Sequence, residues 1–156
     1  MTAASLLATR GLDVIVLKRR LSTSKEPKTI SLDDEALRSY QHAGVVDDVL
    51  SIIIPGTGTR YHDADNHAVF QARAAVPYRN GFSFKNPFEK PGLERVLRGA
   101  RDRNSVARLK FGYTVESLVQ GASSAAVQAR SGDGALTVTA RYVPGGRLRL
   151  LVLSMR

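Results

Sequence analysis

The first twenty residues of the chain constrain its fold more than any other segment. The pattern predicts a short helix over Ala3–Arg10, ended by Gly11, and an apolar strand over Leu12–Leu17 that runs into the basic residues Lys18-Arg19-Arg20. A helix that leads through one glycine into a buried strand is typical of the last two elements of a βαβ unit. We therefore predict an α/β fold.

No first strand and no glycine-rich turn stand in front of this helix. In a dinucleotide-binding βαβ unit that turn lets the backbone approach the pyrophosphate, and free N–H groups at the start of the helix bind it. We therefore expect an incomplete Rossmann-like unit. A missing first strand would leave the strand at Leu12–Leu17 without one neighbour, so we also expect marginal stability and aggregation through that open edge.

Composition sets broad limits. The chain has 156 residues, no cysteine and a formal net charge of +9. Its length fits one domain. Its apolar runs are shorter than the roughly 20 residues that a membrane helix needs. The lack of cysteine is consistent with a location in the reducing cytoplasm. The charge would favour phosphates, but the basic residues are spread along the chain and no nucleic-acid-binding motif accompanies them. A solvated basic surface is favoured over nucleic-acid binding, and no membrane partner is expected.

Further elements follow from capping residues, periodicity and turns. Ser31 resembles the first residue of a capping box, which predicts a helix from about Leu32 to Ala43, closed by Gly44. A second amphipathic helix is expected over Leu93–Arg103. Short strands are expected at Thr59–His62, Ala68–Ala72, Leu109–Phe111, Thr114–Val119, Val127–Arg130 and Leu136–Val143, with Ser131–Gly134 as a hairpin turn. The apolar stretch Leu148–Leu153 could form a strand but has no evident partner.

The turn between the first two of these strands raises the question of a metal site. His62, Asp63, Asp65 and His67 are potential ligands, and Asp-x-Asp also opens calcium-binding loops. Counting onward places alanine where such a loop needs its sharp-turn glycine and its closing glutamate. A hairpin turn is therefore favoured, and no metal ligand is assigned.

Four segments together resemble a known family. They are Gly11-Leu12-Asp13-Val14-Ile15-Val16-Leu17-Lys18-Arg19-Arg20, Glu26-Pro27-Lys28-Thr29-Ile30-Ser31-Leu32-Asp33-Asp34-Glu35, Ile54-Pro55-Gly56-Thr57-Gly58-Thr59-Arg60-Tyr61 and Asn86-Pro87-Phe88-Glu89-Lys90-Pro91. Their order and spacing resemble the N-terminal half of the FAD-dependent aromatic hydroxylases of the p-hydroxybenzoate hydroxylase type. The branch that acts on 3-(3-hydroxyphenyl)propionate is the most similar.

The resemblance implies an FAD-binding domain interrupted by a substrate domain. NAD(P)H reduces the flavin of such enzymes, and oxygen then hydroxylates a phenolic ring, so a small aromatic substrate is the implied partner. It places the cofactor-binding positions at Lys18, Arg19, Lys28, Lys90 and Val115. No catalytic residue of the family can be placed in this chain.

Three of these positions depart from the family pattern. Lys18 stands where an acidic residue accepts hydrogen bonds from the adenosine ribose, and a lysine cannot accept them. Losing charge-assisted bonds of about 1.5–3 kcal/mol would weaken binding by roughly one to two orders of magnitude. Lys28 replaces a common arginine and loses its bidentate fork, and Lys90 replaces a common glutamine. We therefore expect weak or absent FAD binding.

The end of the chain also departs from the family. We expect residues 1–143 to form the partial FAD-binding domain with the first substrate-side hairpins, and residues 144–156 to be an unrelated tail, as a reading-frame change near Pro144 would produce. Three interpretations stay open at this point. The chain is an inactive piece of a flavin monooxygenase, one segment of a working enzyme whose other parts were lost by gene misannotation, or a basic non-catalytic module that binds nucleic acid.

Overall fold

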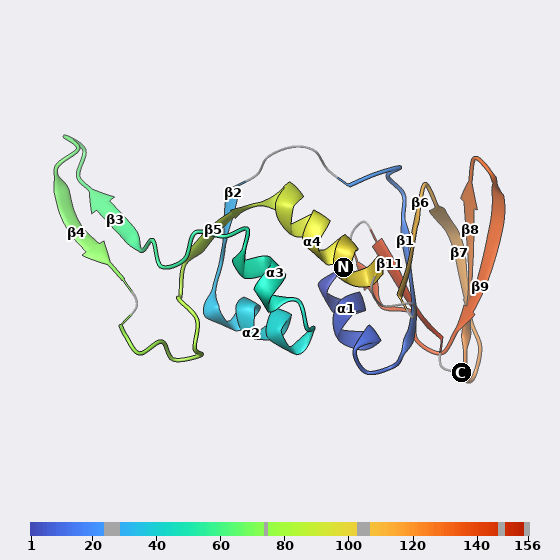
Figure 1. Cartoon of the computed structure of the whole chain (residues 1–156). Helices are drawn as coiled ribbons and strands as arrows, with labels where there is room; N and C mark the ends of the chain where they lie inside the picture. The colour runs from blue at the N-terminus through green and yellow to red at the C-terminus, as the bar shows by residue number, and fades with distance from the viewer. Residues whose placement is uncertain (24–28, 74, 103–106, 147–148, 155–156) are drawn as a thin grey trace. The chain divides into compact units, whose positions relative to one another are not determined.

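The computed structural model describes residues 1–23, 29–73, 75–102, 107–146 and 149–154. The chain divides into two compact units (Figure 1). Unit 1 contains residues 1–24 and 97–156, and unit 2 contains residues 25–96. Among the described residues, no helix combines the length and the apolar character that crossing a bilayer requires.

Unit 1 begins with the predicted helix and strand. Helix α1 spans Thr2–Ala8 and strand β1 spans Asp13–Lys18, with Gly11 between them at a φ of 74°. A positive φ strains residues that carry a Cβ, so glycine suits this turn. The prediction from the sequence is confirmed to within two residues at each end of both elements.

Strand β1 has a neighbour on each side. On one side β6 (Ala107–Phe111) runs parallel to it, with Val14 opposite Ala107 and Lys18 opposite Phe111. On the other side β11 (Arg149–Ser154) runs antiparallel to it. A short strand β10 (Gly145–Gly146) pairs with β11, so the order of strands in the sheet is β10-β11-β1-β6. The expected open edge is therefore wrong, because the apolar tail that lacked an evident partner pairs with β1 over its whole length.

The two faces of β1 contribute to two clusters of buried side chains. Val14 and Val16 pack with Ala4 and Ala8 of α1, and Ala107 of β6 joins them. Ile15 and Leu17 point to the opposite face because side chains alternate along a strand. They pack with buried residues of a second sheet, namely Val127, Ala129, Val138 and Ala140. This alternation places Lys18 on the same face as Val14 and Val16.

The second sheet of unit 1 is an antiparallel meander. Its strands are β7 (Thr114–Gln120), β8 (Ala125–Ser131) and β9 (Gly134–Ala140). Ser131 and Gly134 are paired across the hairpin between β8 and β9, where the sequence predicts a turn. The last strand differs from the prediction, since it begins at Gly134 and ends at Ala140, three residues before Val143.

Unit 2 has two helices packed together and a two-stranded sheet. Helix α2 spans Asp34–His42 and α3 spans Val46–Leu50, while β2 (Thr29–Leu32) pairs antiparallel with β5 (Asn86–Glu89). Sequence reasoning missed both strands, because each has only four residues and β5 contains a proline, which usually argues against a strand. Helix α4 (Lys90–Asp102) follows β5 directly and crosses into unit 1 after Val96.

The cap of α2 differs from the predicted one. The Asp33 carboxylate, rather than the Ser31 hydroxyl, accepts from the N–H of Ala36 at 2.7 Å. The Ser31 hydroxyl accepts instead from the N–H of Asn86 at 3.2 Å, across the β2–β5 sheet. The reason is that β2 extends to Leu32, so the cap and the start of the helix lie two residues later than predicted. Gly44 ends the helix as predicted, with a φ of 68°.

The Asp33 cap gives a first prediction. Asp33→Ala should lower the free energy of unfolding of unit 2 by about 1 kcal/mol, because the Ala36 N–H loses its acceptor and the start of the helix loses a favourable negative charge. Urea unfolding followed by circular dichroism measures this loss. Ser31→Ala should lower the free energy of unfolding by a similar amount, because the N–H of Asn86 on β5 loses its acceptor, but it should not reduce the helical signal. A loss of helix in Ser31→Ala but not in Asp33→Ala would contradict the assignment of Asp33 as the cap.

The predicted hairpin is present in unit 2 with the predicted bounds. Strands β3 (Thr59–His62) and β4 (Ala68–Ala72) pair around a turn in which the Asp63 carboxylate accepts from the N–H groups of Asp65 and His67. The rings of Tyr61 and Phe70 stack with centroids 4.3 Å apart. The carboxylate that suggested a metal ligand thus holds the turn, and the described residues contain no group of three potential ligands that could bind a metal.

Asn86 holds three segments of unit 2 together. It is fully buried, and its side-chain amide donates to the carbonyl oxygens of Leu32 at 3.0 Å and Ser83 at 2.6 Å. Its side-chain oxygen accepts from the N–H of Gly56 at 3.4 Å and from the Ser83 hydroxyl. One side chain therefore joins the end of β2, the segment before β5 and the loop before β3.

Candidate cofactor site

The candidate cofactor site lies in unit 1, where β1 ends. Lys18 is the last residue of β1 and is only 6% exposed. Its Nζ lies 5.4 Å from the ring centroid of Phe111, which is its register partner on β6. The carboxyl ends of parallel strands are where open α/β sheets bind their ligands. The residue that the sequence singles out is thus placed at the expected edge of the sheet.

A second cation lies at the same ring. The guanidinium carbon of Arg98, from the part of α4 that belongs to unit 1, is 5.7 Å from the centroid of Phe111. Sequence reasoning missed Arg98 and Phe111. Arg98 was one of the basic residues spread along the chain, and the strand register that aligns Phe111 with Lys18 cannot be read from the sequence.

The other predicted cofactor residues divide between the units. Arg19 is exposed in unit 1, and Val115 on β7 is 37% exposed. The N–H of Tyr113 donates to the carbonyl of Lys18 at 3.2 Å, which brings the start of β7, and with it Val115, to the end of β1. Lys90 is the first residue of α4 and belongs to unit 2. Lys28 lies outside the described residues. The roles of all five residues stay predictions.

The net positive charge of the chain belongs entirely to unit 1. Unit 1 contains 14 Lys and Arg residues against four Asp and Glu, which gives +10, whereas unit 2 contains nine against ten, which gives −1. Fields of one sign attract ligands of the opposite sign and raise their local concentration. Unit 1 is therefore suited to anionic ligands.

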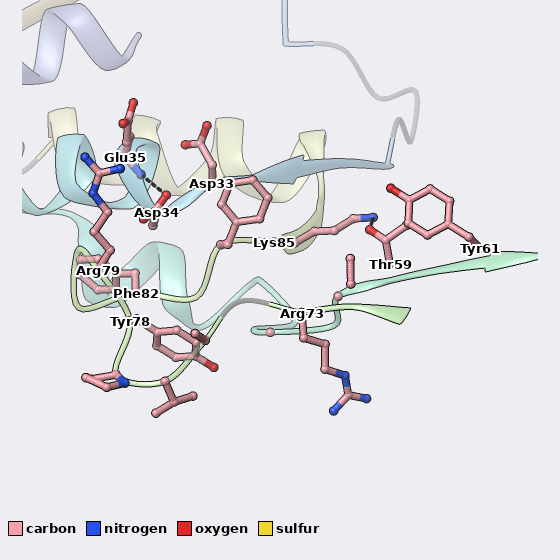
Figure 2. A pocket seen from close by; sticks show the side chains of 17 residues that line it. Asp33, Asp34, Glu35, Thr59, Tyr61, Arg73, Tyr78, Arg79, Phe82 and Lys85 are labelled. Atoms are coloured by element: carbon pink, nitrogen blue, oxygen red, sulfur yellow. Dashed lines mark hydrogen bonds between the residues drawn. The ribbon is translucent and has the colours of Figure 1, made fainter. Parts of the chain in front are cut away.

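Unit 2 contains a cavity of about 830 Å³ that mixes aromatic and charged side chains (Figure 2). Tyr61, Tyr78 and Phe82 contribute to its aromatic lining. Its charged lining consists of Arg73, Arg79 and Lys85 together with Asp33, Asp34 and Glu35. The Lys85 Nζ donates to the Thr59 hydroxyl at 2.6 Å, as the dashed line in Figure 2 shows. A cavity of this size with an aromatic lining can hold a small aromatic compound.

A comparison with known protein families decides what kind of domain this is. Residues 1–146 match the family described as "FAD binding domain". The chain belongs to this family. The resemblance found in the sequence is thus confirmed.

Curated relatives of this FAD-binding domain are named 3-(3-hydroxy-phenyl)propionate/3-hydroxycinnamic acid hydroxylase. The chain is 28% identical to the protein of Mycolicibacterium smegmatis over 145 residues, which are 93% of the chain and 26% of the relative. It is 32% identical to the protein of Mycolicibacterium gilvum over 146 residues, with 93% and 25% covered. The chain therefore spans about a quarter of the length of these relatives.

Solved structures show the same fold. A p-nitrophenol 4-monooxygenase of Pseudomonas putida superimposes with a TM-score of 0.78 at 14% identity, covering 90% of the chain and 36% of the neighbour. The flavin-dependent monooxygenase PieE, solved with FAD and substrate, superimposes with a TM-score of 0.75 at 20% identity, covering 90% and 27%. At these identities the likeness concerns the fold alone.

The donor set at the end of β1 does not fit the ribose of FAD. An adenosine ribose offers hydroxyl groups that need an acceptor, and the acceptor in nucleotide-binding folds of this kind is a carboxylate. Lys18 and Arg98 carry only donors. The FAD-binding fold is thus present, but neither Lys18 nor Arg98 offers the carboxylate acceptor that a ribose hydroxyl uses in such folds.

Proposed function

We propose that this chain forms the nucleotide-side part of the FAD-binding domain of a flavin-dependent monooxygenase that hydroxylates a phenolic acid with NAD(P)H and oxygen. The observation that carries the proposal is the family match over residues 1–146, together with the α1–β1–β6 layer that ends at the candidate site. FAD, when bound, supplies the oxygen chemistry, and the protein supplies binding and orientation. A cytoplasmic location belongs to the same proposal.

We further propose that this chain, as it stands, binds FAD weakly and does not hydroxylate by itself. The support is Lys18, which puts a positive charge where a carboxylate would accept from the ribose. None of the described side chains is assigned a catalytic role. The contribution of the chain to the reaction is therefore binding and positioning, within an enzyme of the size of its relatives.

The cavity of unit 2 is the proposed place for the aromatic acid. Tyr78 and Phe82 offer ring contacts, and the guanidinium of Arg79 can pair with a carboxylate in a bidentate geometry. The names of the curated relatives supply the probe, 3-(3-hydroxyphenyl)propionate. Its ring matches the aromatic side chains and its propionate carboxylate matches Arg79, whereas the carboxylates of Asp33, Asp34 and Glu35 in the same lining repel it.

Isothermal titration calorimetry of the chain with 3-(3-hydroxyphenyl)propionate tests this function. We expect saturable binding that Arg79→Ala weakens about tenfold, the loss of one charge-assisted contact. Arg38→Ala is the matched control, because Arg38 is exposed on α2 and donates to Gln41 at 2.6 Å. No binding, or equal loss in both variants, would contradict the assignment of the cavity.

A further inference from the structure

We propose that the edge of β1 that pairs with β11 is a strand-exchange surface. Its partner is an apolar β-strand that enters α1 through a glycine-rich turn and pairs with β1 in parallel, and β11 gives way to this strand. The inference rests on the topology of unit 1 and goes beyond the proposed function. It requires neither hydroxylation nor a bound flavin.

The pairing of β1 leaves one place for such a partner. A strand can pair along two edges, and β6 occupies one edge of β1 in parallel. The six residues of β11 occupy the other edge, antiparallel, from Asp13 to Lys18. A further strand that joins β1 in parallel must therefore take the edge where β11 lies.

The position of α1 identifies this partner as the strand that enters the helix. In a βαβ unit, the strand that enters the helix and the strand that leaves it pair in parallel. Strand β1 leaves α1 through the turn at Gly11. Ala8 of α1 and Val14 of β1 belong to one buried cluster, so the helix packs on a face of β1. The edge that β6 leaves open is thus the edge that this topology assigns to the entering strand.

The rest of unit 1 holds β1 without help from β11. The two buried clusters on the faces of β1 join it to α1, β6, β8 and β9. Strand β11 forms a hairpin with β10, whose two residues are Gly145 and Gly146, and glycine offers no side chain for packing. The β10–β11 hairpin can therefore leave the sheet while the pairing of β1 with β6 and the β7–β9 meander stay in place.

The entering strand also has an advantage in composition and connection. Two of the six residues of β11, Arg149 and Ser154, are polar, whereas valine and isoleucine can fill every position of an entering strand and favour the extended backbone. A short turn into α1 keeps that strand at a high effective concentration beside β1. A tenfold preference for the entering strand would displace β11 in about nine molecules of ten.

An introduced cysteine pair can report where β11 lies, because the chain has no cysteine of its own. Asp13 and Ser154 are register partners in the β1–β11 ladder. Register partners lie within the Cα separation that a disulfide spans, so Asp13→Cys combined with Ser154→Cys should form a disulfide on oxidation. Gel electrophoresis without reductant measures the rate of its formation.

The probe is an extension of the intact chain in front of Thr2. It consists of six valine and isoleucine residues followed by a turn of the pattern G-x-G-x-x-G with alanine at each x. We expect this extension to slow formation of the Asp13–Ser154 disulfide at least about tenfold, because β11 is displaced. The matched extension has proline at two of the six strand positions, cannot complete the ladder, and should leave the rate unchanged.

A second cysteine pair controls for unfolding. Gln128 and Thr137 are register partners in the β8–β9 ladder, and both are exposed. Their double cysteine variant places the same reporter in a sheet that the exchange leaves intact. Its disulfide should form at the same rate with either extension, and circular dichroism should show a folded chain.

A thermal measurement tests the same surface without cysteines. Replacing residues 149–154 with glycine and serine removes the strand propensity of β11, so this variant should have a lowered Tm. The apolar extension should raise that Tm again, because it supplies β1 with a new partner, and the proline extension should not. An unchanged Tm with the apolar extension would overturn the proposal.

The supporting result is a slower Asp13–Ser154 disulfide with the apolar extension alone, while the Gln128–Thr137 disulfide is unaffected. Equal rates with both extensions would show that β11 is not displaced and would overturn the proposal. Slowing of both disulfides would also overturn it, because unit 1 would then unfold rather than exchange a strand. No readout uses a flavin or an aromatic acid, so these outcomes are independent of the calorimetric test of the proposed function.

Discussion

Replacing Asn86 with alanine should lower the free energy of unfolding of unit 2 by about 3 kcal/mol. The carbonyls of Leu32 and Ser83 would lose their donor, and the N–H of Gly56 would lose its acceptor. Buried polar groups without partners are the costly ones, because folding removes them from water. Urea unfolding monitored by circular dichroism measures the loss.

Two further variants separate the hydrogen bonds from the volume of the side chain. Asn86→Asp keeps the size and the acceptor but loses both donations to carbonyls, so we expect it to be destabilising as well. Asn80→Ala removes one half-buried bond, from the Asn80 amide to Asp34 at 2.8 Å, and should cost about 1 kcal/mol. A loss for Asn86→Ala no larger than that for Asn80→Ala would refute the role of Asn86.

A chain that ends at Val143 should be less stable by roughly 3–6 kcal/mol, or should self-associate through β1. The six residues of β11 pair with Asp13–Lys18. Without β11, the N–H and C=O groups on that side of β1 have no hydrogen-bond partner in the sheet. Thermal unfolding and light scattering after gel filtration measure the two outcomes.

The control for this truncation keeps the length of the chain. Replacing residues 149–154 with glycine and serine removes strand propensity while the tail stays present, and it should reproduce the effect of the truncation. A truncated chain that stays monomeric and unfolds at the same temperature as the intact chain would show that β11 adds nothing to the sheet.

Local patterns in the sequence predict most of the elements but not all of their neighbours. The helix at α1, the strand at β1 and the β3–β4 hairpin follow from glycine positions and apolar runs, so they could be recognised without the fold. The pairing of β11 with β1 joins residues more than 130 positions apart, and no local signal encodes it. That long-range pair is why the expected open edge was wrong.

The candidate site was only partly predictable, because part of it depends on long-range strand pairing. Lys18 was identifiable from the resemblance, because the strand in front of it is clear and its charge is opposite to the family's. Arg98 and Phe111 come together with it only through the β1–β6 register and the course of α4. The network of Asn86 was equally hidden, since an asparagine before a proline reads in sequence only as a loop leading into a helix.

The most direct test of the central claim is FAD retention by the intact chain and by Lys18→Glu. Each protein is incubated with excess FAD, passed through a desalting column, and assayed for flavin absorbance per mole of protein. We expect almost colourless wild-type protein and an affinity for FAD roughly tenfold or more higher in Lys18→Glu, because a carboxylate accepts from the ribose. One mole of tightly bound FAD per mole of wild-type chain would contradict it.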